Sequence, residues 1–244
     1  MFAARSEPTT DSGPDLPNIP LLDDAIDHQP ELEKKPAWRG WIHAGTFPLA
    51  IVLGIVLIVL SEGAPAKIAS AVFMASSLLL FGISAIYHRF DWKPTTKAVF
   101  RRLDHSNIFL LIAGTYTPLA IDALEYPQNV ILLSVIWGGA ILGILSRIFW
   151  LKAPRWSYVV LYIALGWAAM VYIVDLVNAN VATMVLVLIG GVAYTTGALF
   201  YAFKRPNPVP GVFGFHELFH SCTVIAFLCH WTAILLIAMN PVTG

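Results

Sequence analysis

The chain carries an uncharged apolar run, IHAGTFPLAIVLGIVLIVL, at residues 42–60. A helix needs about 20 apolar residues to cross the roughly 30 Å hydrocarbon core of a membrane, and this run has that length. Similar runs follow it along the rest of the chain. We interpret seven runs as membrane-spanning helices, at residues 42–60, 68–88, 104–124, 129–149, 157–175, 181–203 and 214–239. The sequence therefore predicts an all-α, polytopic membrane protein built as a seven-transmembrane helix bundle.

The overall composition agrees with this interpretation. Of the 244 residues, 57% are hydrophobic and 12% are charged, whereas soluble domains usually carry about 25% charged residues. A formal net charge of zero argues against a nucleic-acid partner. The runs are too long for barrel strands and lack alternating hydrophobicity, so helices are predicted. Pro118 and the Gly190-Gly191 pair predict kinks or close helix packing.

The N-terminal segment differs from the rest of the chain. Residues 1–36 hold eight acidic residues, three basic residues and six prolines, with few large apolar side chains. Such a composition cannot bury a core. We therefore predict a disordered acidic tail over residues 1–37 and a single membrane domain over 38–244. The first ten residues contain no apolar segment of the kind found in cleavable secretory signals.

The positive charges predict the orientation in the membrane. Every Lys and Arg except Lys67 lies in the N-terminal segment or in the second, fourth and sixth predicted connections. Because positive residues concentrate on the cytoplasmic side, we expect a cytoplasmic N-terminus and an outside C-terminus in the plasma membrane. Six helices with a re-entrant segment remain an alternative. No internal repeat is apparent, which disfavours inverted-repeat transporter folds.

Ionisable residues gather at the predicted cytoplasmic ends of three spans. His216 and His220 are four residues apart, so both rings project from one helix face. Ser84 and His88 have the same spacing, and Asp104 begins the third span. Three neutral imidazoles and a water form an open zinc site of the catalytic kind, although copper or nickel would also suit imidazoles. A carboxylate such as Asp104 could orient the water or accept its proton, and the Ser84 hydroxyl could hydrogen-bond either group.

A second interpretation of the last histidine pair is possible. Residues 216–220, HELFH, also match the H-E-x-x-H pattern of zinc proteases, in which the glutamate is the general base. Such proteases need a further ligand downstream, and no acidic residue follows Glu217. We therefore expect Glu217 to be solvated or to lie behind the ligands, while its role as the base stays open.

These residues resemble the signature of a known family. The strings SAIYH at 84–88, LDH at 103–105, AGTYTP at 113–118 and the pair His216 and His220 are similar to the hemolysin III proteins. Those proteins are the bacterial branch of the progestin and adipoQ receptor family, which includes the adiponectin receptors and is related to alkaline ceramidases. The likeness covers about residues 38–240 and leaves the acidic tail outside it.

The resemblance carries several implications. It implies seven helices with the N-terminus inside and Zn²⁺ on His88, His216 and His220. It also implies that Asp104 contacts the zinc-bound water, with Ser84 nearby. Ceramidases of the wider group cleave the amide of ceramides, and bacterial members have been linked to membrane fluidity and lipid homeostasis. The older family name comes from a pore-forming, haemolytic activity.

Other candidate residues receive simpler interpretations. We expect a packing or supporting role for His105, an interfacial position for His43, and a buried, hydrogen-bonded ring for His230, with a lipid-headgroup contact as its alternative. The bases of the second connection could hold anionic headgroups. Interfacial anchoring is expected for the indoles of Trp38, Trp41, Trp92, Trp150 and Trp156.

Three functions fit these observations. The first is a zinc-dependent intramembrane hydrolase, ceramidase-like, that acts on a membrane lipid amide or ester. The second is a non-enzymatic sensor or receptor in which structural zinc joins helix ends; structural sites normally have four protein ligands, and only three histidines are evident. The third is a pore, which the nearly uncharged mid-spans support poorly. The sequence favours the hydrolase.

Overall fold

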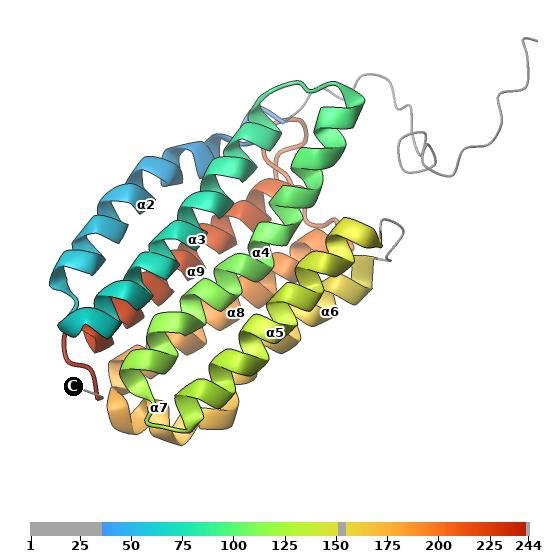
Figure 1. Cartoon of the computed structure of the whole chain (residues 1–244). Helices are drawn as coiled ribbons and strands as arrows, with labels where there is room; N and C mark the ends of the chain where they lie inside the picture. The colour runs from blue at the N-terminus through green and yellow to red at the C-terminus, as the bar shows by residue number, and fades with distance from the viewer. Residues whose placement is uncertain (1–35, 151–154, 243–244) are drawn as a thin grey trace, which may run out of the picture. The chain divides into compact units, whose positions relative to one another are not determined.

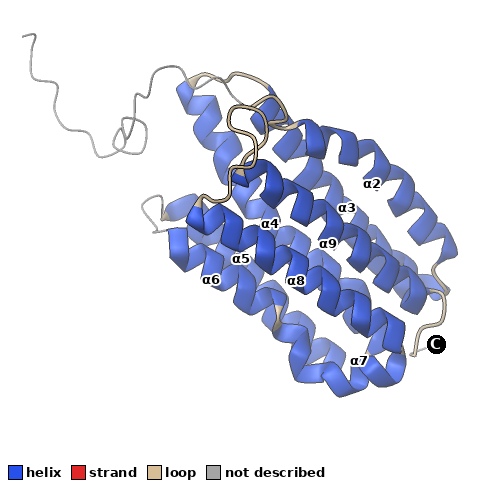
Figure 2. Cartoon of the chain, turned by 180° about the vertical axis from the view of Figure 1, so that it is seen from behind, coloured by secondary structure: helices blue, strands red, loops and turns tan. Residues whose placement is uncertain are grey.

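The fold is an all-helical bundle, known here from a computed structural model that describes residues 36–150 and 155–242, without the side chains of 155 and 156. The helices are α2 (Trp41–Leu60), α3 (Gly63–Arg89), α4 (Pro94–Ala123), α5 (Gln128–Phe149), α6 (Arg155–Gly166), a 3₁₀ turn η1 (Ala168–Tyr172), α7 (Ile173–Ala179), α8 (Val181–Phe203) and α9 (Phe215–Ala238) (Figure 1). The described residues contain no strand (Figure 2). The all-α prediction is therefore confirmed.

The helices pack mainly against their sequence neighbours. The closest pairs are α2 with α3, α3 with α4, α4 with α5, and α8 with α9. The last helix, α9, also packs against α2, α4 and α3, so it joins the two ends of the described chain. Because consecutive helices alternate in direction, the start of α2, the end of α3 and the start of α9 meet at one end of the bundle.

Six helical segments are long and apolar enough to cross a membrane: Trp41–Leu60, Gly63–Arg89, Gln128–Phe149, Ser157–Ala179, Val181–Phe203 and Phe215–Ala238. A multi-pass membrane protein is thus supported. The expected span at 104–124 lies in α4, which is not among these six, so the count of seven is not confirmed.

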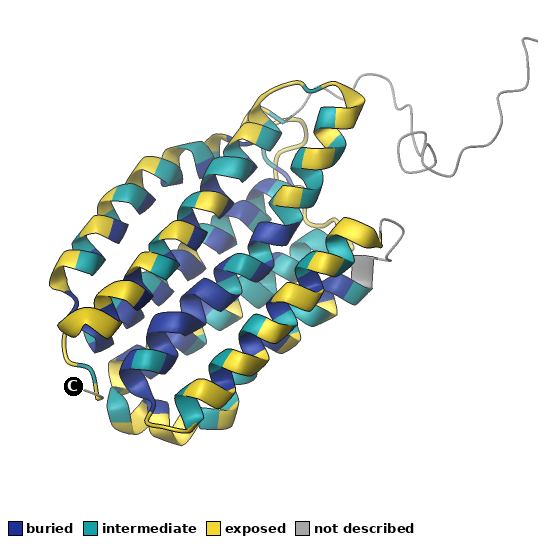
Figure 3. Cartoon of the chain, in the orientation of Figure 1, coloured by how far each residue is buried: buried dark blue, intermediate teal, exposed yellow. Residues whose placement is uncertain are grey.

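The position of α4 explains its lower hydropathy. Nearly every residue from Leu111 to Ala123 is buried, on all sides of the helix (Figure 3). Its buried residues include Thr115, Thr117 and Asp122. A helix enclosed by other helices has no lipid-facing surface to cover with large apolar side chains, and it can carry polar groups that satisfy themselves locally. Thr115 and Thr117 do this by donating to carbonyls one turn earlier.

The expected span at 157–175 is interrupted between α6 and α7. The Tyr116 hydroxyl of α4 enters this break, where it donates to the Gly166 carbonyl at 2.8 Å and accepts from the Ala169 amide at 2.9 Å. Backbone groups freed by an irregular turn in an apolar environment need such a partner. Tyr116 therefore stabilises a break that the hydropathy pattern does not predict.

The structure also tests the packing predicted at the Gly190-Gly191 pair. Gly190 lies where α8 approaches α9, and a Cβ at this position would overlap the His230 ring, so the predicted close packing is confirmed. Cys222 and Cys229 are both free thiols. The predicted tail falls almost wholly on residues 1–35, outside the described residues, and the Lys152, Arg155 and Trp156 side chains are outside them too. The division at 37 and 38 stays a prediction.

Candidate metal centre

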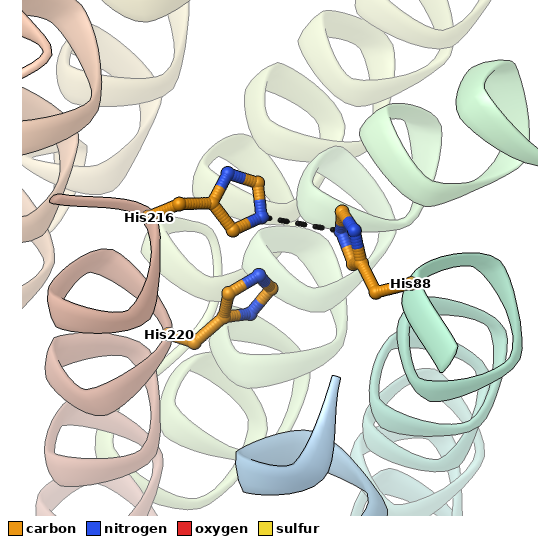
Figure 4. Close-up of side chains that lie close together, drawn as sticks. All are labelled: His88, His216 and His220. Atoms are coloured by element: carbon orange, nitrogen blue, oxygen red, sulfur yellow. Dashed lines mark hydrogen bonds between the residues drawn. The ribbon is translucent and has the colours of Figure 1, made fainter. Parts of the chain in front are cut away.

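Three histidine rings converge at the end of the bundle where α2 starts. His88 lies in the last turn of α3, and His216 and His220 lie in the first turns of α9 (Figure 4). One ring nitrogen of each residue lies within 4.8 Å of those of the other two. The structure thus brings together the three residues that the sequence singled out as a ligand set, although 128 positions separate His88 from His216.

The donor set fits a divalent metal ion. The Nε2 atoms of His88 and His216 are 3.3 Å apart, and two nitrogens bound about 2.0–2.1 Å from one tetrahedral zinc ion would be separated by about 3.3–3.4 Å. The Nε2 atom of His220 is buried and has no hydrogen-bond partner among the described residues. The group could therefore hold a metal ion, and three protein ligands would leave one position of a tetrahedral ion open.

Asp104 and Ser84 lie beside the three rings. An Oδ2 atom of Asp104 is 3.6 Å from Nε2 of His88, so the carboxylate reaches the ligand group without replacing a ligand. Ser84 is buried one turn deeper than His88 and lies near the Asp104 carboxylate. All five residues selected from the sequence therefore occupy one site, and their individual roles are proposals that we develop below.

Glu217 is buried, so of its two expected positions, solvated or behind the ligands, the solvated one is wrong. Its side chain is 1% exposed. One carboxylate oxygen accepts from Nε of Arg39 at 2.6 Å, and the other accepts from the amide of Gly214 at 2.9 Å. The carboxylate therefore caps the N-terminus of α9 and holds Arg39, and it is absent from the described lining of the cavity beside the histidines. Both oxygens have partners, which explains why the protease-like spacing does not produce a protease-like site.

His43 is the residue whose position the sequence interpretation missed. It is 3% exposed, not interfacial. Its two ring nitrogens lie 2.9 and 2.8 Å from Nδ1 of His220, and the two rings are nearly perpendicular, with an interplanar angle of 86°. The signal in the sequence was its depth, because His43 lies at the same predicted membrane level as the three clustered histidines.

The two remaining histidines of the bundle line the same cavity as the three-histidine group but do not belong to that group. Nδ1 of His105 lies 2.8 Å from a guanidinium nitrogen of Arg147, and the His105 carbonyl accepts from Tyr162. The ring of His230 is buried, and its Nε2 lies 3.3 Å from the Val187 carbonyl. The interpretation of His230 as a buried, hydrogen-bonded histidine is confirmed.

A cavity extends from the histidines into the bundle. Its polar end is formed by the three histidines, Asp104 and Ser84, and its far part is lined by side chains of α4, α6, α8 and α9, among them Thr115, Tyr194 and His230. The space between the lining side chains is about 1170 Å³, its open mouth included. Most of the lining is apolar, so the cavity suits an apolar molecule with a polar group near the histidines.

Comparison with known proteins identifies the family. The family model described as "Haemolysin-III related" matches residues 33–231, which include all five site residues. The chain belongs to the haemolysin-III-related family. This haemolysin-III-related protein is 37% identical over 143 residues to "Hemolysin-3" of Bacillus cereus and 33% identical over 135 residues to "Hemolysin-3 homolog" of Bacillus subtilis.

The relatives differ in how much of each chain is matched. The two Bacillus matches cover 58% and 55% of this chain. They span 65% and 63% of the Bacillus proteins, just under two thirds of their length. The chain is also 27% identical over 200 residues to "Adiponectin receptor protein" of Drosophila melanogaster, covering 72% of this chain and 44% of that protein. The predicted resemblance to the hemolysin III proteins is thus confirmed, and the likeness extends more distantly to a protein named as an adiponectin receptor.

Proposed function

We propose that this haemolysin-III-related protein is a zinc-dependent membrane hydrolase that cleaves the amide or ester bond of a lipid and thereby serves membrane lipid or fluidity homeostasis. One observation carries the proposal. Three imidazoles and a carboxylate lie together at the polar end of a cavity that is otherwise mainly apolar. That arrangement would set a reactive centre against the head of a lipid while the cavity holds its chain.

His88, His216 and His220 are the proposed metal ligands. Zinc bound there would lower the pKa of a water toward about 7 and polarise a carbonyl group. The three imidazoles leave a coordination position free, which is the pattern of catalytic rather than structural sites. The burial of His220 supports the proposal, because a buried ring nitrogen without a partner is costly unless something binds it.

Asp104 is the proposed proton carrier. The oxygen of water adds to the carbonyl carbon of the lipid, and the carbon–nitrogen or carbon–oxygen bond breaks. Asp104 accepts the proton that the water loses and passes it to the departing nitrogen or oxygen, which leaves a carboxylic acid and an amine or alcohol. The buried Ser84 hydroxyl has no hydrogen-bond partner among the described residues, and in the proposed reaction it would hydrogen-bond the water or the Asp104 carboxylate. The Glu217 carboxylate is buried and paired with the partly exposed Arg39, which supports Asp104, and not Glu217, as the base.

We place the site near the cytoplasmic face of the plasma membrane, with seven spans, an inside N-terminus and an outside C-terminus. The charge distribution supports this orientation, because the exceptional base, Lys67, starts the second helix at the opposite end of the bundle. The length of α4 and its enclosure by the other helices support its role as the seventh span.

The test begins with the metal. Wild-type protein purified without chelator is compared with the His216→Ala/His220→Ala double variant by elemental analysis. We expect about one zinc per wild-type chain and none in the variant. Both proteins are then incubated with a ceramide and with a phospholipid, each labelled in the acyl chain, and released fatty acid is measured. Absence of metal from the wild type would refute the proposal.

A receptor is the second candidate. The match to a protein named adiponectin receptor favours this function. The proposed ligands also come from two helices, α3 and α9, and a bound ion would join these helices. A wild-type protein that binds zinc but releases no fatty acid from any lipid tested would favour this function over the hydrolase.

A further inference from the structure

The two ring nitrogens of His220 have different surroundings. Nδ1 is in contact with His43, at 2.9 and 2.8 Å from the two nitrogens of that ring. Nε2 has no partner among the described residues. An imidazole that binds a metal through one nitrogen usually donates the hydrogen on its other nitrogen to a nearby acceptor, and this bond fixes the tautomer and the ring orientation. His43 is the group that Nδ1 of His220 contacts.

The fold holds His43 in this place from several sides. One turn before it, Arg39 forms the ion pair with Glu217 and fixes the start of α2 against the start of α9. The edge of the Phe81 ring packs against the His43 ring, with the centroids 5.1 Å apart. Gly40, with φ of 81°, lets the chain enter α2 so close to His88 that a Cβ on Gly40 would lie 3.1 Å from the His88 Cβ. The start of α2 is therefore packed against both helices that carry the histidines.

We propose that His43 is a positioning residue of the metal site, accepting the hydrogen bond from Nδ1–H of His220 and so leaving Nε2 of His220 free to bind the ion. This role rests on the proposed metal site. The three-histidine group has a nitrogen of every member within 4.8 Å of the others, and His43 is not in that group. His43, which also lines the cavity, thus contacts a ligand but lies outside the three-histidine ligand set, which keeps the site three-coordinate on the protein side.

The experiment measures zinc affinity apart from activity. Protein in detergent is stripped of metal and titrated with zinc against a competing chelator. We expect His43→Leu, which keeps the bulk but removes the acceptor, to weaken zinc binding about 10–100-fold. His43→Gln, whose amide oxygen can accept the same hydrogen bond, should restore most of the affinity. If His43 were itself a ligand, Gln would not rescue it, and equal losses in both variants would overturn the proposal.

A matched control separates positioning from packing. Trp231 of α9 donates to the Leu53 carbonyl of α2 at 2.9 Å, so Trp231→Phe removes one hydrogen bond between the same two helices far from the site. We expect this variant to lower the melting temperature of the metal-free protein and to leave the zinc dissociation constant unchanged. Equal weakening of zinc binding by Trp231→Phe and His43→Leu would show that general packing of α2 on α9 is responsible, and would overturn the proposal.

The wild type offers a test that does not depend on the folding of a variant. Nitrogen-15 NMR of the histidines in zinc-loaded protein should show hydrogen on Nδ1 of His220, and hydrogen on its Nε2 would refute the role of His43. The failures are distinguishable: a wild type that binds no zinc refutes the metal site and this role with it. If the wild type binds zinc and His43→Leu binds it equally tightly, the positioning role alone is refuted.

Discussion

Removal of the metal should lower the stability of the bundle by a predictable amount. An ion held by His88, His216 and His220 would join the end of α3 to the start of α9, which otherwise contact each other little compared with α8 and α9. Such an ion would bind the folded protein and not the separated helices, so it would contribute a free energy of unfolding that depends on the ratio of its free concentration to its dissociation constant.

The magnitude follows from that ratio. At a free zinc concentration of one hundred times the dissociation constant, the stabilisation is about 2.7 kcal/mol. A protein of this size gains about 2–4 °C in melting temperature for each kcal/mol, so chelation should lower the melting temperature by about 5–11 °C. The histidine nitrogens are already grouped within 4.8 Å, and so little of this energy is lost to ordering the site.

The assay is thermal unfolding in detergent, followed by circular dichroism, with zinc buffered at a known free concentration or removed by a chelator. His88→Ala should unfold at one temperature in both conditions. His105→Gln is the matched control, because His105 lies next to Asp104 in sequence but contacts Arg147 and not the cluster; it should keep the full response. A wild type that melts at the same temperature with and without chelator, or a His88→Ala protein that still responds, would refute the metal site.

Three further predictions concern catalysis and the packing of the bundle. Asp104→Asn should retain its zinc but lose lipid hydrolysis by about 10²–10⁴-fold; unchanged release of fatty acid would show that Asp104 is not the proton carrier. Tyr116→Phe leaves two backbone groups without their partner and should destabilise the protein by about 2–6 kcal/mol. Tyr162→Phe, which removes a single hydrogen bond, should cost about half as much in the same denaturation measurement, and equal losses would contradict the bridging role of Tyr116. Arg39→Met leaves the Glu217 carboxylate buried without its ion pair and should destabilise the protein by about 3–5 kcal/mol; a melting temperature equal to that of the wild type would contradict this.

The sequence predicts much of the fold because hydropathy reports contact with lipid. The span at 181–203 coincides with α8, and the predicted limits of the spans at 129–149 and 214–239 fall within a residue of α5 and α9. Prediction is poorer where burial by protein replaces burial by lipid. Helix α4 begins ten residues before the expected span at 104–124, and its enclosed part carries polar groups that lower its hydropathy.

Part of the candidate site could also be predicted from the sequence, and part could not. Regular helix spacing brings His216 and His220 to one face, and the alternating direction of the helices brings His88 to the same end, so their convergence could be predicted. The contact between His43 and His220 depends on which neighbour α9 packs against, and spacing along the chain carries no such information. The break at Tyr116 has the same cause, since it depends on a side chain from another helix.

The separation of the clustered histidines along the chain has a consequence for biosynthesis. His88 enters the membrane with an early helix, whereas His216 and His220 belong to the last one, 128 positions later. During translation, therefore, the ligand set stays incomplete until almost the whole membrane domain has been made and α9 has inserted between its neighbours. A chain truncated before α9 keeps His88 and loses the other two rings, so metal retention would report that a molecule has been both fully synthesised and correctly assembled.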